Sequence, residues 1–126
     1  MDPALAAAIP RAERALASCD AKLLAETVAF PFSWAPLMVE DGDRENQGER
    51  RVTFATAAAM AKACKDEEER TTPRGRVPGV DAEAKGDVLF LTDGSCGAEC
   101  LQWGFARKAG AWKLVWAGPV WVAPKP

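Results

Sequence analysis

Leu101–Phe105 (LQWGF) and Trp112–Trp116 (WKLVW) are two stretches in which large apolar residues recur at every second position. Side chains two residues apart on a β-strand point to the same face of a sheet. Between the two stretches lies Lys108–Ala111, which contains a glycine. This arrangement predicts an antiparallel hairpin with one buried aromatic face, and it places Trp103 and Trp116 in the core. The residues expected on the opposite, outward face are Gln102, Lys113 and Val115.

The composition is that of a packed globule with no strong charge. The chain has 126 residues, of which 48% are hydrophobic, and its formal net charge is −2. We therefore expect a single domain over residues 1–126, with a short Pro-containing tail that leaves the sheet from about residue 119. Because Lys and Arg are scattered, nucleic acid is not an expected partner. No apolar run approaches the roughly 20 residues that span a bilayer, so no membrane span is expected.

The segments before the hairpin alternate between helical and extended patterns. Apolar residues three and four apart predict helix from Leu5 to Leu23, which Pro10 either restarts or bends. Asp20 is expected to cap a second helical segment that ends at Phe30-Pro31-Phe32. We further expect a strand over residues 32–39, a third helix capped by Thr53 with Phe54 on its apolar face, mostly loop over 71–86, and a strand over 87–92.

This order predicts an α+β fold in which N-terminal helices pack on a curved antiparallel sheet. Asp20–Phe32 (DAKLLAETVAFPF) resembles the helix-to-strand junction of the nuclear transport factor 2-like superfamily, which has a cystatin-like cone fold. Phe105–Leu114 (FARKAGAWKL) resembles its final hairpin. The resemblance implies a cone-shaped domain, often with a pocket, and often a homodimer formed through the outer face of the sheet.

The same resemblance leaves the activity open. The superfamily contains isomerase-like, cyclase-like and dehydratase enzymes as well as non-catalytic binding domains, so the fold does not decide the function. Its enzymes commonly place an Asp, His or Tyr in the pocket, and this chain has no His and no Tyr. No catalytic residue is therefore transferred, and no cofactor or metal is expected.

Several aromatic residues and carboxylates are candidates for function. The aromatic residues either line a pocket for a small apolar ligand or fill the core, and they are Trp34, Trp103, Phe105 and Trp116. Asp41, Asp43 and Glu45 alternate as at the start of a calcium loop. Asn46 stands where that loop needs glycine, so a solvated turn is favoured. Our leading interpretation is a non-catalytic binding or association domain for a small apolar ligand or another protein chain. The alternative is a small pocket enzyme of isomerase or dehydratase type that uses a carboxylate base, Glu26 or Asp87.

The redox state of the four cysteines would indicate the cellular compartment of the protein. Cys19 and Cys64 lie on apolar helix faces, whereas Cys96 and Cys100 flank the start of the hairpin, so we predict the disulfides Cys19–Cys64 and Cys96–Cys100. The alternative is four reduced thiols. A zinc site is disfavoured because only one pair is close in sequence. Disulfides would place the protein in the periplasm or outside the cell, as the mature form of an exported protein; otherwise it is cytoplasmic.

Overall fold

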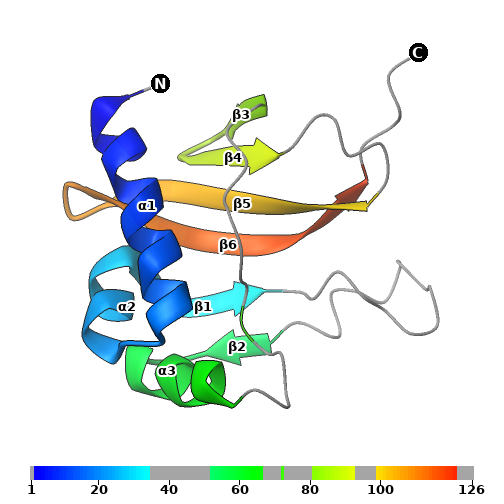
Figure 1. The fold of residues 1–126 in the computed structure, drawn as a ribbon. Coiled ribbons are helices and arrows are strands. Elements are labelled where there is room, and N and C mark those ends of the chain that lie inside the picture. The colour runs from blue at the N-terminus through cyan, green and yellow to red at the C-terminus, as the bar shows by residue number, and fades with distance from the viewer. Residues whose placement is uncertain (1, 35–51, 67–71, 73–80, 93–98, 122–126) are drawn as a thin grey trace.

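The computed structural model describes residues 2–34, 52–66, 72, 81–92 and 99–121. These ranges form three helices and six strands, which confirms the predicted α+β class (Figure 1). The elements are α1 (Pro3–Ser18), α2 (Ala21–Thr27), β1 (Val28–Trp34), β2 (Val52–Phe54), α3 (Ala57–Lys65), β3 (Asp81–Lys85), β4 (Val88–Thr92), β5 (Glu99–Lys108) and β6 (Ala111–Trp121).

The six strands form one sheet in the order β2-β1-β6-β5-β4-β3. All neighbouring pairs are antiparallel except β1 and β6, which run parallel. The sheet is therefore mixed, whereas the sequence predicts antiparallel pairing throughout. A parallel pair requires a crossover connection, and here the long segment between the first and last strands supplies it.

The helices begin and end at residues that supply caps. The Asp2 carboxylate accepts a hydrogen bond from the Ala4 N–H at 2.8 Å, and α1 then runs through Pro10 without ending. Cys19 turns the chain with a left-handed φ of 57°. Asp20 caps α2 as predicted, accepting from the N–H groups of Lys22 at 2.8 Å and Leu23 at 3.2 Å.

The third helix begins later than expected. Thr56, not Thr53, is its N-cap, and the Thr56 hydroxyl accepts from the Ala59 N–H at 3.2 Å. Phe54 belongs to β2, where it pairs with Phe32 and is 7% exposed. The prediction was wrong here because a three-residue strand gives almost no periodic signal and its apolar residues merge with the helical pattern.

Two prolines lie inside strands that the sequence places differently. β1 covers Val28–Trp34 rather than residues 32–39, and Pro31 falls where the pairing with β6 is interrupted, between Val28 and Ser33. β6 continues to Trp121, past the point at which the tail was expected to leave the sheet. Beyond Ala117 its described pairing is with β5 alone, so Pro119 lies in an edge-like stretch, where proline is tolerated.

One hydrophobic core lies between the helices and one face of the sheet, which we call the inner face. The helices supply Leu5, Leu16, Leu24 and Met60, and the sheet supplies Phe32, Leu91, Trp103, Phe105 and Leu114. The opposite face, which we call the outer face, carries none of these side chains. Figure 1 shows α1 crossing in front of the sheet and α3 at the end of the molecule next to β2.

Candidate functional site

The β5–β6 hairpin closes through a tight turn and contains one irregularity. Ala109 and Gly110 have φ values of 52° and 81°, as the central residues of a type I′ turn require. Phe105 pairs with Leu114, but the next residue of β5, Gly104, pairs with Trp116. Val115 is therefore the extra residue of a β-bulge, and from Trp116 onward the faces of β6 are exchanged.

The bulge moves Trp116 to the outer face. Phe90 and Trp116 both pair with Gly104, from the two neighbouring strands, so their side chains lie on the same side of the sheet as the missing glycine side chain. Their rings meet edge to face, with centroids 5.8 Å apart and an interplanar angle of 79°. Both rings are half-buried. The sequence prediction that Trp116 is a core residue on the face of Leu114 is therefore wrong.

Gly104 makes this aromatic contact possible. A Cβ at this position would lie 3.1 Å from the Phe90 ring, 3.1 Å from a Val88 methyl group and 3.2 Å from the Trp116 Cβ. These separations are tighter than ordinary van der Waals contact. A side chain at this strand position would therefore require its neighbours to move by a few tenths of an ångström.

The same register places polar residues around the aromatic pair. The row through Gly104 runs from Glu83 on β3 through Phe90 and Trp116 to Ser33 on β1 and Thr53 on β2. Gln102 and Lys113 also lie on the outer face, as predicted, and both are half-buried. The outer face thus has an aromatic centre with Val88 and Ala106 beside it and polar residues further out.

The inner face holds the other predicted ligand residues. Trp34 and Trp103 pair with Ala117 from its two sides, and Phe105 lies on the same face. These side chains are 6%, 1% and 0% exposed, and all belong to the core cluster. The structure therefore brings three of the four predicted aromatic residues together as core and places Trp116 on the opposite side.

The carboxylates proposed as catalytic bases lie at the surface. Glu26 is 44% exposed in its side chain and faces Arg11 at 3.8 Å. Asp87 is exposed in the turn between β3 and β4. Among the polar residues whose burial the structure describes, only Thr27 and Thr72 are buried, and neither carries a carboxylate.

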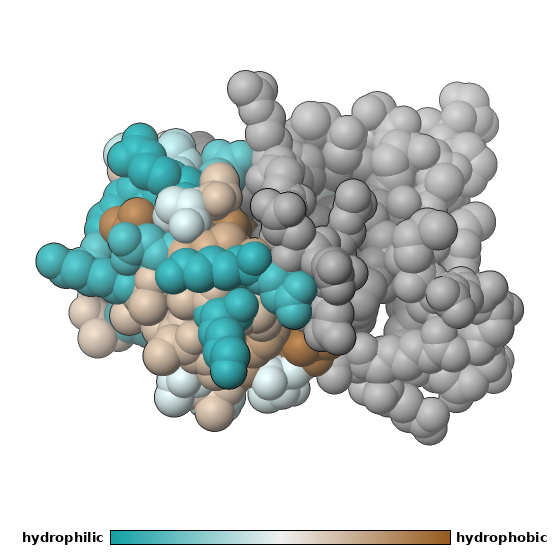
Figure 2. Space-filling model, turned by 60° about the horizontal axis from the view of Figure 1, so that its bottom comes forward, coloured by the Kyte–Doolittle hydropathy of each residue, from teal (hydrophilic) through white to brown (hydrophobic). Residues whose placement is uncertain are grey.

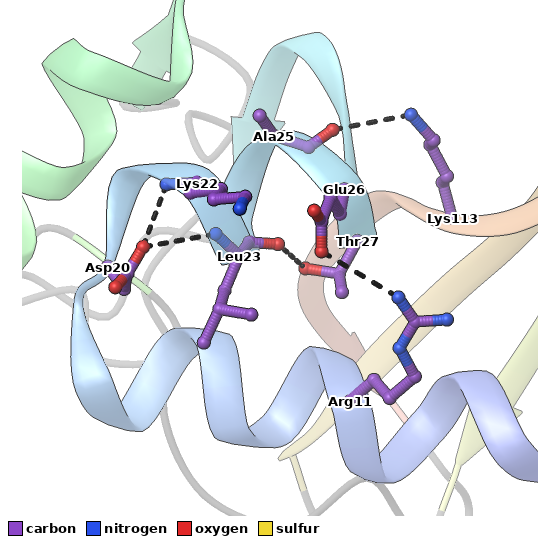
Figure 3. Close-up of polar contacts among 8 residues, drawn as sticks. All are labelled: Arg11, Asp20, Lys22, Leu23, Ala25, Glu26, Thr27 and Lys113. Atoms are coloured by element: carbon purple, nitrogen blue, oxygen red, sulfur yellow. Dashed lines mark hydrogen bonds and ion pairs between the residues drawn. The ribbon is translucent and has the colours of Figure 1, made fainter.

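A shallow groove lies between the first half of α1, the end of α2 and the hairpin turn. Its volume is about 310 Å³, and its walls include Ala4, Ala8, Arg11, Glu26 and Trp112. Figure 3 shows Arg11 reaching from α1 to Glu26 on α2, and Lys113 reaching from β6 to the Ala25 carbonyl at 3.3 Å. These contacts tie the two helices and the hairpin together at one end of the sheet.

The start of the chain is fastened to the same hairpin. One oxygen of the Asp2 carboxylate accepts from Arg107 at 2.8 Å and from the Trp112 indole at 3.2 Å. The Arg107 guanidinium also lies 5.4 Å from the centre of the Trp112 ring. The hydrogen bond from Arg107 makes the largest contribution to lowering the pKa of Asp2 below its usual 3.8, with the Ala4 N–H next.

One of the two predicted disulfides is present. Cys19 and Cys64 are bonded, with Cα atoms 5.5 Å apart. The predicted Cys96–Cys100 pair and the alternating carboxylates Asp41, Asp43 and Glu45 lie outside the side chains that the structure describes. Within the described residues, no three of His, Cys, Asp or Glu cluster as metal ligands would, and no helix is long and apolar enough to cross a membrane.

The helical end of the molecule offers a different kind of surface. Figure 2 brings the end that carries α3 in Figure 1 forward and shows long hydrophilic side chains lying over weakly hydrophobic surface. Strongly hydrophobic residues appear there only as small separate spots. The paired aromatic rings of the outer face have no counterpart in the coloured part of this view.

Comparison with known proteins identifies the architecture. No family model matches the chain, and no curated protein matches it. Among solved structures, a nuclear transport factor 2-like protein of unknown function from Silicibacter pomeroyi is similar, with a TM-score of 0.56 and 17% identity over 94% of this chain and 92% of that one. This chain has the nuclear transport factor 2-like fold. A SnoaL-like protein of unknown function from Burkholderia thailandensis aligns over 98% of both chains, with a TM-score of 0.53 and 12% identity.

A further similar structure is a nuclear transport factor 2-like protein with a cystatin-like fold from Novosphingobium aromaticivorans. It is 16% identical over 94% of this chain and 79% of that one, with a TM-score of 0.52. At these identities the likeness establishes the nuclear transport factor 2-like fold and leaves the function to the residues.

Sequence reasoning missed the outer aromatic pair of this domain. Strict alternation places Trp112, Leu114 and Trp116 on one face, and the chain breaks that alternation at Val115. The sequence signal for the bulge is Gly104, which lies opposite Trp116 in the hairpin. A glycine in the middle of a strand often marks a bulge or a close approach of another group.

Proposed function

We propose that the chain is a non-catalytic association domain that binds another protein chain through the outer face of its sheet. The observation that carries this proposal is the half-buried Phe90–Trp116 pair, which closes over Gly104. Aromatic residues at the centre of a surface patch with a polar surround are typical of protein interfaces.

The inner face gives less support to a small apolar ligand. The candidate residues there, Trp34, Trp103 and Phe105, belong to the same core cluster as Leu16 and Leu24 of the helices. Protein interiors are closely packed, so a ligand at this position would have to displace core side chains. The filled core favours association with a protein over capture of a small ligand.

The alternative of a pocket enzyme has no support from the two carboxylates that the sequence suggests. A carboxylate that acts as a general base within a pocket has to lie in the pocket, within reach of the substrate. Glu26 lines the shallow groove between α1, α2 and the hairpin turn, but it is exposed there and faces Arg11, and Asp87 is exposed in a turn. Neither lies beside Trp103 or the other core aromatic residues.

A second copy of the chain is the partner that we propose. One patch that binds its own copy about a twofold axis makes a closed dimer. Pairing through the edge of the sheet is less suitable, because β3 presents the exposed charges Glu83 and Lys85, and exposed charges oppose edge-to-edge pairing. At the other edge, β2 has only three residues. The outer face therefore supports a face-to-face homodimer better than either edge does.

The disulfide supports an oxidising compartment for this dimer. Disulfides persist in the periplasm and outside cells, and they are rare in the cytosol. The Cys19–Cys64 bond is consistent with a periplasmic or extracellular protein. We propose that location, and expression with and without export tests it by the thiol content of the purified protein.

Light scattering during size exclusion tests the dimer. We expect the wild-type mass to approach twice 13.5 kDa as the loading concentration rises. Trp116→Ser, and separately Gln102→Glu on the same face, should remain at the monomer mass. The matched control Ala7→Ser changes an exposed residue of α1 beside the groove and should dimerise as the wild type does. A wild-type protein that stays monomeric at the highest concentration would refute the homodimer.

A further inference from the structure

The Cys19–Cys64 disulfide joins two elements that are distant in sequence. Cys19 caps the end of α1, and Cys64 lies in the last turn of α3, 45 residues further along the chain. The two residues are 8% and 2% exposed. The bond therefore fastens α3 to the end of α1, the longest of the described helices, from inside the protein.

Within the part of the chain that the structure describes, the elements on the far side of this bond bury few large side chains. The β2–α3 unit (residues 52–65) begins with a three-residue edge strand that pairs only with β1 among the described strands. Its helix has nine residues, shorter than the length at which isolated helices become stable. That helix buries Met60, Ala61 and Cys64, of which only Met60 is large.

The position of the β2–α3 unit also limits the number of elements that it contacts. α3 packs against α2 and β2, and Figure 1 shows it at the end of the molecule, away from β3 and β4. Phe54 is the one large core side chain that β2 contributes, at 7% exposure. Apolar burial by the unit thus depends mainly on Phe54 and Met60, so it contributes little stability. The covalent bond supplies a further constraint that holds the unit in place.

We propose that the Cys19–Cys64 disulfide is a redox-dependent clamp on the β2–α3 unit. When it is oxidised, the unit stays packed on β1 and α2. A dithiol reductant supplies two electrons and two protons, breaks the S–S bond to leave two thiols, and is itself oxidised to a disulfide. The unit then opens locally, while α1, β4 and the β5–β6 hairpin stay folded.

Opening of the unit would expose a defined surface. Phe54 and Met60 would leave the core, and Phe32, Ser33 and Trp34 of β1 would lose their strand partners on that side. The change differs from global unfolding because the hairpin and its contact with α1 do not involve the bond. The device does not depend on the proposed dimer, since the outer-face aromatic residues Phe90 and Trp116 lie on other strands.

Hydrogen–deuterium exchange in the presence and absence of dithiothreitol tests the clamp. The protein would carry Cys96→Ser and Cys100→Ser, so that Cys19 and Cys64 are the only cysteines left to respond. Mass spectrometry of alkylated protein would verify complete reduction. We expect amide exchange in residues 52–65 to rise roughly tenfold or more on reduction, while exchange in the β5–β6 hairpin changes by less than about twofold.

A second variant keeps the test independent of reductant access to the buried bond. Cys19→Ala with Cys64→Ala, in the same background, should show the fast exchange without reductant and no further change when dithiothreitol is added. Equal acceleration across the whole molecule would overturn the proposal, because it would show global destabilisation rather than local opening. Unchanged exchange in residues 52–65 after complete reduction would overturn it as well.

Discussion

The packing of the aromatic residues on the outer face of the sheet depends on Gly104. This glycine lies in the middle of β5 with Phe90 on one side and Trp116 on the other, and both rings close over it. A side chain here would compete for the space that the rings fill. The arrangement of the outer face therefore rests on the absence of a single methyl group.

Replacing Gly104 by Ala should destabilise the protein. The added Cβ would meet the Trp116 Cβ at 3.2 Å, and that atom is fixed to its own strand. Overpacking of this kind lowers the free energy of unfolding by about 1–3 kcal/mol. Alanine also reduces the conformational entropy of the unfolded chain, which raises the free energy of unfolding by about 0.4–1 kcal/mol. We expect a net loss of about 1–2 kcal/mol in urea unfolding. Gln102→Ala, on the same face of the same strand, should change stability by less than about 0.5 kcal/mol.

Asp2 should make stability depend on acid pH. Its folded-state pKa is lowered, chiefly by the hydrogen bond from Arg107. The stabilisation is therefore present above the unfolded pKa near 3.8 and is lost as the pH falls through the folded value. Asp2→Asn keeps the capping oxygen but removes the charge. The difference in Tm between wild type and Asp2→Asn should be constant above about pH 5 and shrink below it. A difference that grows on acidification would contradict the assignment.

The predicted helices and strands agree with the structure where the local sequence pattern extends over many residues. The 3–4 spacing predicts α1, Asp20 is recognisable as the cap of α2, and alternation with a glycine turn predicts the β5–β6 pair. Three features depend on tertiary contacts that local patterns do not encode. They are the short strand β2, the parallel pairing of β1 with β6, and the bulge at Val115.

Because of the bulge, Trp103 and Trp116 lie on opposite faces of the same hairpin and differ in burial. Trp103 is 1% exposed in the core, so Trp103→Ala should cost about 3–5 kcal/mol in the free energy of unfolding. Trp116 is half-buried on the outer face, so Trp116→Ala should cost less, about 1–2 kcal/mol. Chemical denaturation of both variants as dilute monomers gives the comparison. Equal losses would mean that Trp116 shares the core after all.

At the scale of the whole molecule, the chain is a helical layer and a mixed sheet with the nuclear transport factor 2-like fold. Fold class and the Cys19–Cys64 bond could be predicted because helix faces and apolar spacing determine them. The candidate site could not, because it depends on which face Trp116 occupies, and one extra residue in β6 decides that. Among the described residues, the inner face is filled by the core, and Phe90 and Trp116 lie half-buried on the outer face, where we propose that a second copy binds.

Oxidative footprinting of the five tryptophans at low and high protein concentration tests both the place of Trp116 on the outer face and association through that face. At low concentration, hydroxyl radicals should oxidise Trp116 readily and leave Trp34 and Trp103 protected. At high concentration, Trp116 should become protected, whereas the half-buried Trp112 beside the groove should keep its rate. A Trp116 as protected as Trp103 in dilute solution would contradict its place on the outer face, and a Trp116 oxidised equally at both concentrations would contradict association through that face.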